Sequence, residues 1–284
     1  MRTLINSQKI HYTLRIASAM CFIGHGAFGI ITKPIWCNYF ALFGISKITA
    51  FHIMPVLGSV DILMGLLLLI KPFRAVAAWL VVWGIITALC RPLSGEPFAE
   101  FIERAGNYGV PLCLLILAGG IRFNWPWLFS AINPNEAVDE KSLSRVKIIL
   151  RITVFLLLTG HGWLNLIQKP GLINQYTALG FSNPVNVSLL AGIFEIMAAI
   201  AVLVRPARSL IIIFLVWKMG TELFYPHFEI FEWVERGGSY GALLALWFCL
   251  EPIRSERNGL ANSRLGVEGW RLKVGGRRLK SRIH

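Results

Sequence analysis

The side chains that could do chemistry in this chain lie within apolar segments and form two similar sets. The first set is His25, Asp61, Thr87, Arg104 and Tyr108, and the second is His161, Glu195, Thr221, Arg236 and Tyr240. Histidines and carboxylates exchange protons, whereas arginine and tyrosine donate hydrogen bonds. Because ionisable groups within membrane segments are costly and usually face a cavity or a bundle interior, each set predicts a polar pocket that binds a ligand or handles protons.

A tandem repeat explains why the two sets match. Residues 14 to about 118 and 150 to about 250 share their pattern of glycines, charges and apolar runs. The paired motifs include Gly24-His25-Gly26 with Gly160-His161-Gly162, Lys33-Pro34 with Lys169-Pro170, and Glu103-Arg104 with Glu235-Arg236. The two copies therefore serve as a two-member comparison that separates retained polar positions from those that drifted.

Composition and hydropathy indicate an all-α membrane protein. The chain has 284 residues, of which 55% are apolar and 15% charged, whereas soluble domains carry about 25% charged residues. Eight apolar runs approach the ~20 residues that cross a bilayer as a helix. They cover residues 16–32, 51–70, 75–90, 105–121, 152–168, 186–204, 209–225 and 237–251. We therefore expect eight transmembrane helices, four in each repeat.

The distribution of lysine and arginine predicts the orientation. With the N-terminus inside, the inner segments hold 21 of the 28 cationic residues. The positive-inside rule then places both termini in the cytoplasm, in a multi-pass protein of the cell inner membrane. Since each repeat has four spans, both copies point the same way. We expect two parallel four-helix bundles in tandem, related by a pseudo-two-fold axis along the membrane normal.

Four segments are expected along the chain. Residues 1–121 form the first four-helix membrane repeat, 122–149 a polar cytoplasmic linker, and 150–251 the second repeat. Residues 252–284 form a cytoplasmic tail with nine cations and two acids. Basic clusters beside a last span contact anionic lipid headgroups. We therefore expect the net charge of +13 to serve the bilayer, with nucleic-acid binding by the tail as the less favoured alternative.

The two copies differ at one pair of charged positions. Lys218 and Glu222 lie four residues apart in the run at 209–225, so they can pair along a helix. Their counterparts in the first repeat are Gly84 and Ala88. The additional pair favours the second bundle as the active one, and it adds Lys218 and Glu222 to the candidate site.

A purely structural role is the alternative for the retained set. Arg104 or Arg236 could hold Asp61 or Glu195 in a neutral buried pair that only fixes helix geometry. The glycines around the histidines would then serve close helix packing. A metal site is not expected, since one histidine and one carboxylate per bundle are too few ligands, and no H-x-x-x-H or E-x-x-H spacing adds more.

Further marks recur in each copy. They are the Leu-Arg entry to the first span with its Gly-rich end, the acidic residue in the second span, the Lys71-Pro72 or Arg205-Pro206 turn, and the Glu-Arg start of the fourth span. With these marks each repeat resembles the DoxX-like group of small four-helix membrane proteins. The motif around His25 and the duplication depart from a single-bundle member. The resemblance implies an association with sulfur-compound or quinone redox systems, and it identifies no catalytic residue.

Three functions are compatible with these observations. The first is a DoxX-like membrane component that binds a small or lipophilic molecule, such as a quinone, in an outward-facing pocket. There, His161 and Glu195 would exchange protons while Arg236 and Tyr240 donate hydrogen bonds. The second is a transporter or channel for a small solute or proton. The third is a non-catalytic scaffold or assembly subunit with a partner in a membrane complex. No cofactor or reaction is identified by the sequence.

Overall fold

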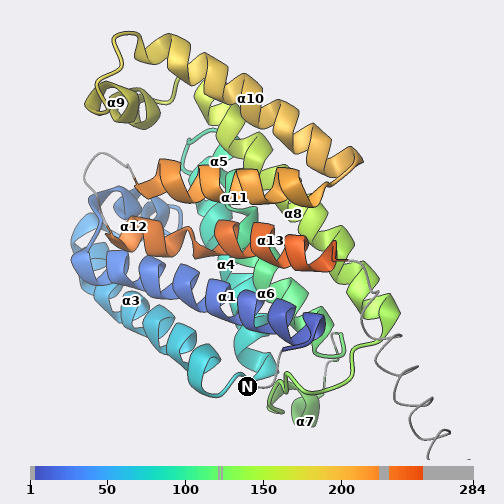
Figure 1. The fold of residues 1–284 in the computed structure, drawn as a ribbon. Coiled ribbons are helices and arrows are strands. Elements are labelled where there is room, and N and C mark those ends of the chain that lie inside the picture. Colours follow the sequence, from blue (N-terminus) through green and yellow to red (C-terminus); the bar gives the residue numbers. More distant parts are fainter. Residues whose placement is uncertain (1–3, 121, 123, 224–229, 252–284) are drawn as a thin grey trace, which may run out of the picture. The chain divides into compact units, whose positions relative to one another are not determined.

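The computed structural model describes residues 4–120, 122, 124–223 and 230–251, and their regular structure is helical apart from one isolated bridge between Phe73 and Ala131 (Figure 1). The first half contains α1 (Asn6–Ile31), the 3-10 helix η1 (Pro34–Trp36), α2 (Cys37–Ala41), α3 (Lys47–Ile70), α4 (Arg74–Leu93), α5 (Ala99–Glu103) and α6 (Ala105–Leu117). After α7 (Trp125–Leu128), the second half contains α8 (Glu140–Leu166), α9 (Pro170–Ala178), α10 (Pro184–Val204), α11 (Arg208–Leu223), α12 (Ile230–Glu235) and α13 (Gly237–Cys249). The order of long and short helices therefore repeats.

Within the described residues, each of the eight apolar runs contains one helix. Four of these helices, α1, α3, α4 and α10, are long and apolar enough to cross a membrane. This result indicates a multi-pass membrane protein. In Figure 1, α1 and α8 both run from right to left, and α13 runs in the opposite direction between them.

Apolar side chains on the outer faces of these helices support a lipid environment. On α10, Leu190, Met197 and Val204 are at least 65% exposed, and on α3, Val56 and Ile70 are at least 63% exposed. Water-facing surfaces rarely carry rows of large apolar side chains. In a bilayer these faces contact lipid tails, which are as apolar as the side chains themselves, so their exposure carries no free-energy penalty.

The turn after the first long helix is the same in both halves. Thr32 and Gln168 end α1 and α8, and each has a positive φ angle, of 62° and 56°. A left-handed residue there reverses the chain and lets backbone groups close the helix end. The Lys-Pro step that follows begins the next helical segment with proline at its first position, where no amide donor is needed.

A cation of the first long helix caps the second long helix in each repeat. Arg15 Nε lies 2.7 Å from the carbonyl oxygen of Leu68, and Arg151 Nη2 lies 3.3 Å from that of Val204. The last carbonyls of a helix have no partner within it and carry partial negative charge. These two arginines satisfy them at the ends of α3 and α10.

Glycines bring the first two long helices of each repeat into backbone contact. A Cβ atom at Gly26 would lie 2.8 Å from the side chain of Ile62 on α3. A Cβ atom at Gly162 would lie 3.0 Å from the carbonyl oxygen of Gly192 on α10. The small residues permit this approach, and it determines the distance between the histidine on one helix and the carboxylate on the other.

Other glycines join the two repeats, which share one core rather than forming self-contained bundles. A Cβ at Gly24 of α1 would lie 2.6 Å from the Cα of Glu235 on α12, and one at Gly160 of α8 would lie 2.6 Å from that of Glu103 on α5. Around the centre of the molecule, α1 packs on α13 and α8 packs on α6. The sequence did not predict this exchange of neighbours, because a glycine pattern does not reveal which helix it faces.

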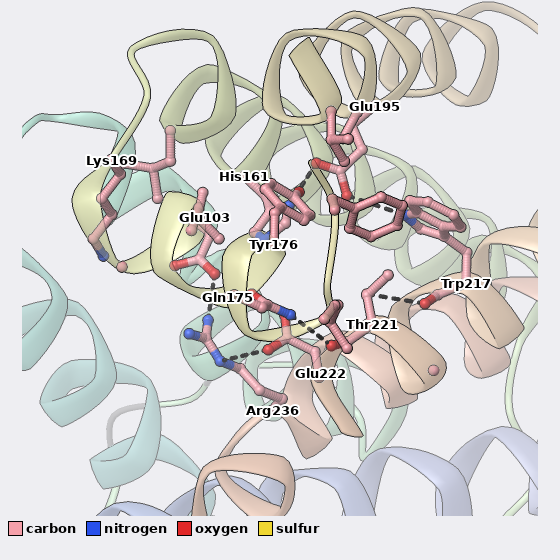
Figure 2. A pocket seen from close by; sticks show the side chains of 18 of the residues that line it. Glu103, His161, Lys169, Gln175, Tyr176, Glu195, Trp217, Thr221, Glu222 and Arg236 are labelled. Atoms are coloured by element: carbon pink, nitrogen blue, oxygen red, sulfur yellow. Dashed lines mark hydrogen bonds and ion pairs between the residues drawn. The ribbon is translucent and has the colours of Figure 1, made fainter. Parts of the chain in front are cut away.

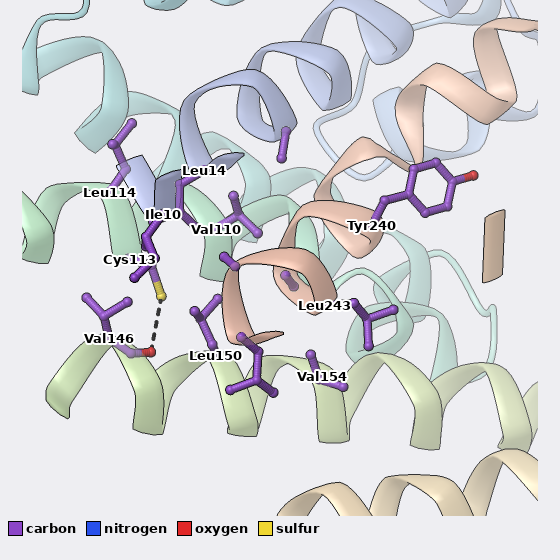
Figure 3. Close-up of a cluster of buried hydrophobic side chains, with 14 of the residues drawn as sticks. Ile10, Leu14, Val110, Cys113, Leu114, Val146, Leu150, Val154, Tyr240 and Leu243 are labelled. Carbon is purple, nitrogen blue, oxygen red and sulfur yellow. Dashed lines mark hydrogen bonds between the residues drawn. The ribbon is translucent and has the colours of Figure 1, made fainter. Parts of the chain in front are cut away.

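The shared core is apolar (Figure 3). Leu14 of α1, Val110 of α6, Leu150 of α8 and Leu243 of α13 are all completely buried in one continuous cluster. Removing apolar surface from water stabilises a protein by about 25 cal/mol per Å². This packing therefore stabilises any part of the core that would otherwise be exposed to water. It holds the ends of the four central helices in fixed positions, and these ends carry the polar residues.

Candidate functional site

The larger of two similar cavities lies in the second repeat (Figure 2). It has a volume of about 440 Å³ and is bordered by residues of α8, α9, α10 and α11. Glu103 of the first repeat also lines it, together with Arg236. We call it the second-repeat pocket. Its size falls within the range of small-molecule sites, roughly 300–1,000 Å³.

A histidine and a carboxylate pair on the wall of this pocket. His161 Nδ1 lies 2.5 Å from Glu195 Oε2, and Glu195 is 1% exposed. Trp217 Nε1 donates to the other carboxylate oxygen at 3.3 Å. Because Nδ1 of His161 is engaged, its second ring nitrogen is the one left for a ligand. The pair can therefore hold a proton next to a bound acceptor.

Asn165 supports this pair, one helical turn after His161. Its amide nitrogen lies 3.3 Å from His161 Nδ1 and 3.4 Å from Glu195 Oε2. Tyr176 donates to its side-chain oxygen Oδ1 at 2.8 Å, and the Ser188 hydroxyl lies 2.8 Å from the Asn165 backbone carbonyl oxygen and 3.1 Å from Oδ1. The amide is thus fixed in orientation by two hydroxyls, and it steadies the histidine and the carboxylate together.

Sequence reasoning missed Asn165, Tyr176 and Trp217 as site residues. The candidate residues were chosen mainly because both copies retain a polar side chain at that position. Asn165 does not meet this condition, since the first repeat has Gly29 there. Trp217 has a matching tryptophan, Trp83, but indoles were not counted among the ionisable and hydroxyl groups. The spacing of four residues between His161 and Asn165 was the available signal, since it places both on one helix face.

The first repeat contains a similar but smaller pocket, of about 230 Å³. His25 Nδ1 lies 2.7 Å from Asp61 Oδ2, and Asp61 is 2% exposed. The imidazole stacks on Trp36, with 4.6 Å between ring centroids. We call this cavity the first-repeat pocket. The predicted grouping of His25 with Asp61, and of His161 with Glu195, is therefore present in the structure.

The retained arginines do not hold these carboxylates, in contrast to the structural alternative. Arg104 Nη1 lies 2.6 Å from Glu100 Oε2 and 2.7 Å from Glu103 Oε2. Arg236 Nη1 also donates to Glu103. The reason is local, since Glu100 and Glu103 precede Arg104 on the same short helix, whereas Asp61 already pairs with His25.

Two further ion pairs exchange partners between the repeats. Lys33 Nζ of the first repeat lies 3.1 Å from Glu232 Oε2 of the second. Its counterpart Lys169 pairs in turn with Glu100 of the first repeat. These reciprocal bridges explain why both copies retain the lysine and the glutamate, because each copy uses them to hold the other.

The acidic residues of α5 stay ionised despite burial. Burial raises the pKa of Glu100, but the positive charges of Arg104, Lys169 and Arg91 outweigh it and hold the pKa at about 2. Burial likewise raises the pKa of Glu103, and Arg236 and Arg104 lower it well below its usual range. These groups act as fixed charges rather than proton carriers at neutral pH.

The pair that distinguishes the repeats is also present. Lys218 Nζ lies 2.9 Å from Glu222 Oε1, and both side chains are buried. Glu222 lines the second-repeat pocket, and its other oxygen lies 3.8 Å from Arg236 Nε. The predicted pair on α11 is therefore linked through Glu222 to Arg236 and its carboxylate partners beside the pocket.

The remaining predicted site residues divide into two kinds. Thr87 and Thr221 line the two pockets, but their hydroxyls donate to carbonyls of their own helices at 3.0 Å. Tyr108 and Tyr240 do not line either pocket. Tyr108 stacks on Phe101 and Tyr240 packs on Trp233, so the structure assigns these tyrosines to helix packing.

Two further sources of functional information are metal-binding clusters and similarity to known proteins. Within the described part of the chain, no three His, Cys, Asp or Glu side chains are placed to hold a metal ion. Comparisons with protein-family models, with curated proteins and with solved structures find no match for the chain. The functional argument therefore depends on the residues themselves.

Proposed function

We propose that this chain is a DoxX-like protein of the cell inner membrane that binds a small lipophilic molecule of the quinone class in the second-repeat pocket. The eight predicted spans form two parallel four-helix repeats with both termini in the cytoplasm. The pocket opens toward the outer side, and the protein serves a redox-linked membrane system in which another component supplies the electrons. Anionic lipid headgroups contact its basic tail at residues 252–284, which lie outside the described residues.

The single observation that carries this proposal is the position of the His161–Glu195 pair between a polar interior and an apolar groove. A groove lined by Val187, Leu190, Ala191, Phe194 and Trp217 adjoins the pocket and shares three of these residues with it. Its lining is almost entirely apolar. A ligand with a polar head and an apolar tail matches such a site.

The groove lies where two helices are loosely joined. α10 packs on α8 and α9, whereas α11 packs on α12 and α13. Aromatic side chains bridge α10 and α11, with the ring of Phe194 5.4 Å from that of Trp217 and 5.8 Å from that of Phe214. A ligand dissolved in the bilayer would enter between these helices, past Phe194 and Trp217.

The chemistry of the pair suits a quinone carbonyl. The free ring nitrogen of His161 would donate a hydrogen bond to the carbonyl oxygen and transfer its proton when that oxygen is reduced, while the carboxylate of Glu195 would orient the ring and balance its charge. Trp217 and Asn165 hold Glu195 and His161 in place for this transfer. Arg236, which the sequence favoured as a ligand donor, is engaged by Glu103 and contributes positive charge to the wall.

Binding of a short-chain quinone to the purified protein in detergent tests the proposal. We expect Glu195→Gln and His161→Ala to weaken binding by about ten- to hundred-fold, since each removes a charge-assisted hydrogen bond. The matched first-repeat variants, Asp61→Asn and His25→Ala, should leave quinone affinity unchanged. Wild-type protein that neither retains nor binds quinone would contradict the proposal.

The same variants separate the alternatives. Proton or solute flux in liposomes that is abolished by Glu195→Gln would indicate a transporter or channel. A stable membrane partner that co-purifies, with no effect of either Glu195→Gln or His161→Ala, would indicate a scaffold subunit.

A further inference from the structure

A carboxylate from the second repeat completes the first-repeat pocket. Glu235, at the end of α12, lines this cavity beside His25 and Asp61 and is 8% exposed. Among the residues that the structure describes, no hydrogen bond or ion pair engages its carboxylate. An ionised group this deeply buried requires a counter-charge.

The counterpart of Glu235 shows what is missing. Glu103 occupies the same position in the first repeat and contacts both Arg104 and Arg236. Arg236 also faces Glu222 and Glu232, at 3.8 and 3.7 Å. Both arginines are therefore bonded to other carboxylates, and the near-symmetry of the repeats leaves one of two equivalent carboxylates without a bonded cation among the described residues.

Glu235 nevertheless stays ionised. Burial raises its pKa, but the positive charges of His25, Arg236, Arg104 and Lys33 outweigh this effect and lower the pKa below its usual range. The other cation of the pocket wall, Arg91, is bound to Glu96 at 3.0 Å and to Glu100 at 3.3 Å. Among the described residues, Glu235 is therefore the carboxylate of this wall that no cation binds directly, whereas the arginines of the wall are bound to other carboxylates.

The rest of the wall is aromatic. The cavity is lined by Trp36, Tyr39, Phe40, Phe43 and Trp83. Faces of aromatic rings attract cations, and they do so most strongly where water is excluded. A buried carboxylate combined with aromatic walls is the chemistry that recognises an alkylammonium ion rather than a hydrated metal cation, which prefers several oxygen ligands.

We propose that the first-repeat pocket binds a small organic ammonium ion, with Glu235 as its counter-ion and the aromatic side chains as its walls. At about 230 Å³ the cavity has room for a compact cation and not for a large lipophilic molecule. This site is separate from the second-repeat pocket and does not depend on the function proposed for it.

Equilibrium dialysis of radiolabelled tetramethylammonium against the full-length protein in detergent tests this site. We expect saturable binding with one site per chain, and Glu235→Gln should weaken it by about ten-fold or more. Glu235→Asp retains the charge at a shorter reach and should weaken binding less. tert-Butanol, a neutral molecule of similar shape, should not compete.

Controls separate loss of the counter-ion from loss of fold. Glu136→Gln also removes one carboxylate, but Glu136 is half-exposed and pairs with Arg74 away from the pocket, so it should bind as wild type does. Thermal unfolding should show that Glu235→Gln remains folded. Absence of saturable binding to the wild type, or equal binding by Glu235→Gln, would overturn the proposal.

Discussion

The two pockets contain the same pair of functional groups in different surroundings. In the second repeat, Asn165 and Trp217 both bond to Glu195, and the pocket is nearly twice as large. In the first repeat, His25 is the one hydrogen-bond partner of Asp61 among the described residues, and several aromatic side chains line the wall. Duplication thus preserved the histidine–carboxylate pair while its supporting residues changed.

Two substitutions account for much of this difference. At the position of Asn165 the first repeat has Gly29, where a Cβ atom would lie 2.7 Å from the Cα of Gly58. Because α1 and α3 approach so closely there, no amide side chain fits. Asp61 is one methylene shorter than Glu195, and the indole nitrogen of the neighbouring Trp83 is buried without a hydrogen-bond partner.

The comparison shows that residues retained in both repeats can have different kinds of role. The arginines, and the glutamates that bind them, hold the repeats together, whereas the histidine pairs face cavities. Three experiments test how far the two halves have diverged.

The largest effect on stability is expected at Glu103, which two arginines bind although no cation binds its counterpart Glu235 among the described residues. Glu103→Gln removes a shared partner of the buried Arg104 and the largely buried Arg236 and should lower the free energy of unfolding by about 3 to 5 kcal/mol. Its counterpart Glu235 has no bonded partner among the described residues, so Glu235→Gln should lower the free energy of unfolding by less than Glu103→Gln does. Thermal unfolding of both variants in detergent measures the contrast, and equal losses would show that the two carboxylates are equivalent.

The second experiment uses pH. The pKa of Glu100 in the folded protein is about 2, below its ordinary value of 4.5. Its ion pairs therefore stabilise the fold fully above about pH 4.5, and this contribution is lost as the pH falls toward 2. Glu100→Gln should cost about 3 kcal/mol at neutral pH and flatten the dependence of the unfolding temperature on pH between 4.5 and 2.

Glu232 provides the matched control for Glu100. It pairs with Lys33 at 3.1 Å and with Arg236 at 3.7 Å, whereas Glu100 is bound by Arg104, Arg91 and Lys169. Glu232→Gln should therefore cost less stability at neutral pH. If Glu232→Gln lowers the free energy of unfolding more than Glu100→Gln does, the ion pairs of Glu100 are not the stronger set, and this prediction is wrong.

The smallest effect concerns the two matching tryptophans. Trp217→Phe removes the hydrogen bond to Glu195 and should destabilise the protein by about 1 kcal/mol. Trp83→Phe removes an indole nitrogen that has no partner, so it should be close to neutral. Unfolding in denaturant can compare them, and equal costs would mean that the indole of Trp217 serves only in packing.

The helices were predictable because their signal is local. Apolar runs and proline-containing turns located the long helices, although α8 begins at Glu140, within the predicted linker. The repeated motifs placed His25 with Asp61 and His161 with Glu195 in one polar set per repeat, but their direct pairing came from the structure. Asn165 was not found, because its contribution depends on Ser188 and Tyr176 lying beside it. Tyr108 and Tyr240 were expected in the pockets because both copies retain them four residues after Arg104 and Arg236, but the structure packs them on Phe101 and Trp233.

By itself the sequence determined the helical class, the duplication and the composition of the polar set, since each follows from the order and spacing of residues along the chain. The tertiary structure decided which repeat supplies each partner. Gly24 and Gly160 admit helices of the other repeat, so Glu235 reaches the pocket of His25 and Glu103 reaches that of His161. Such exchange depends on backbone contact between segments far apart in sequence, which no local pattern specifies.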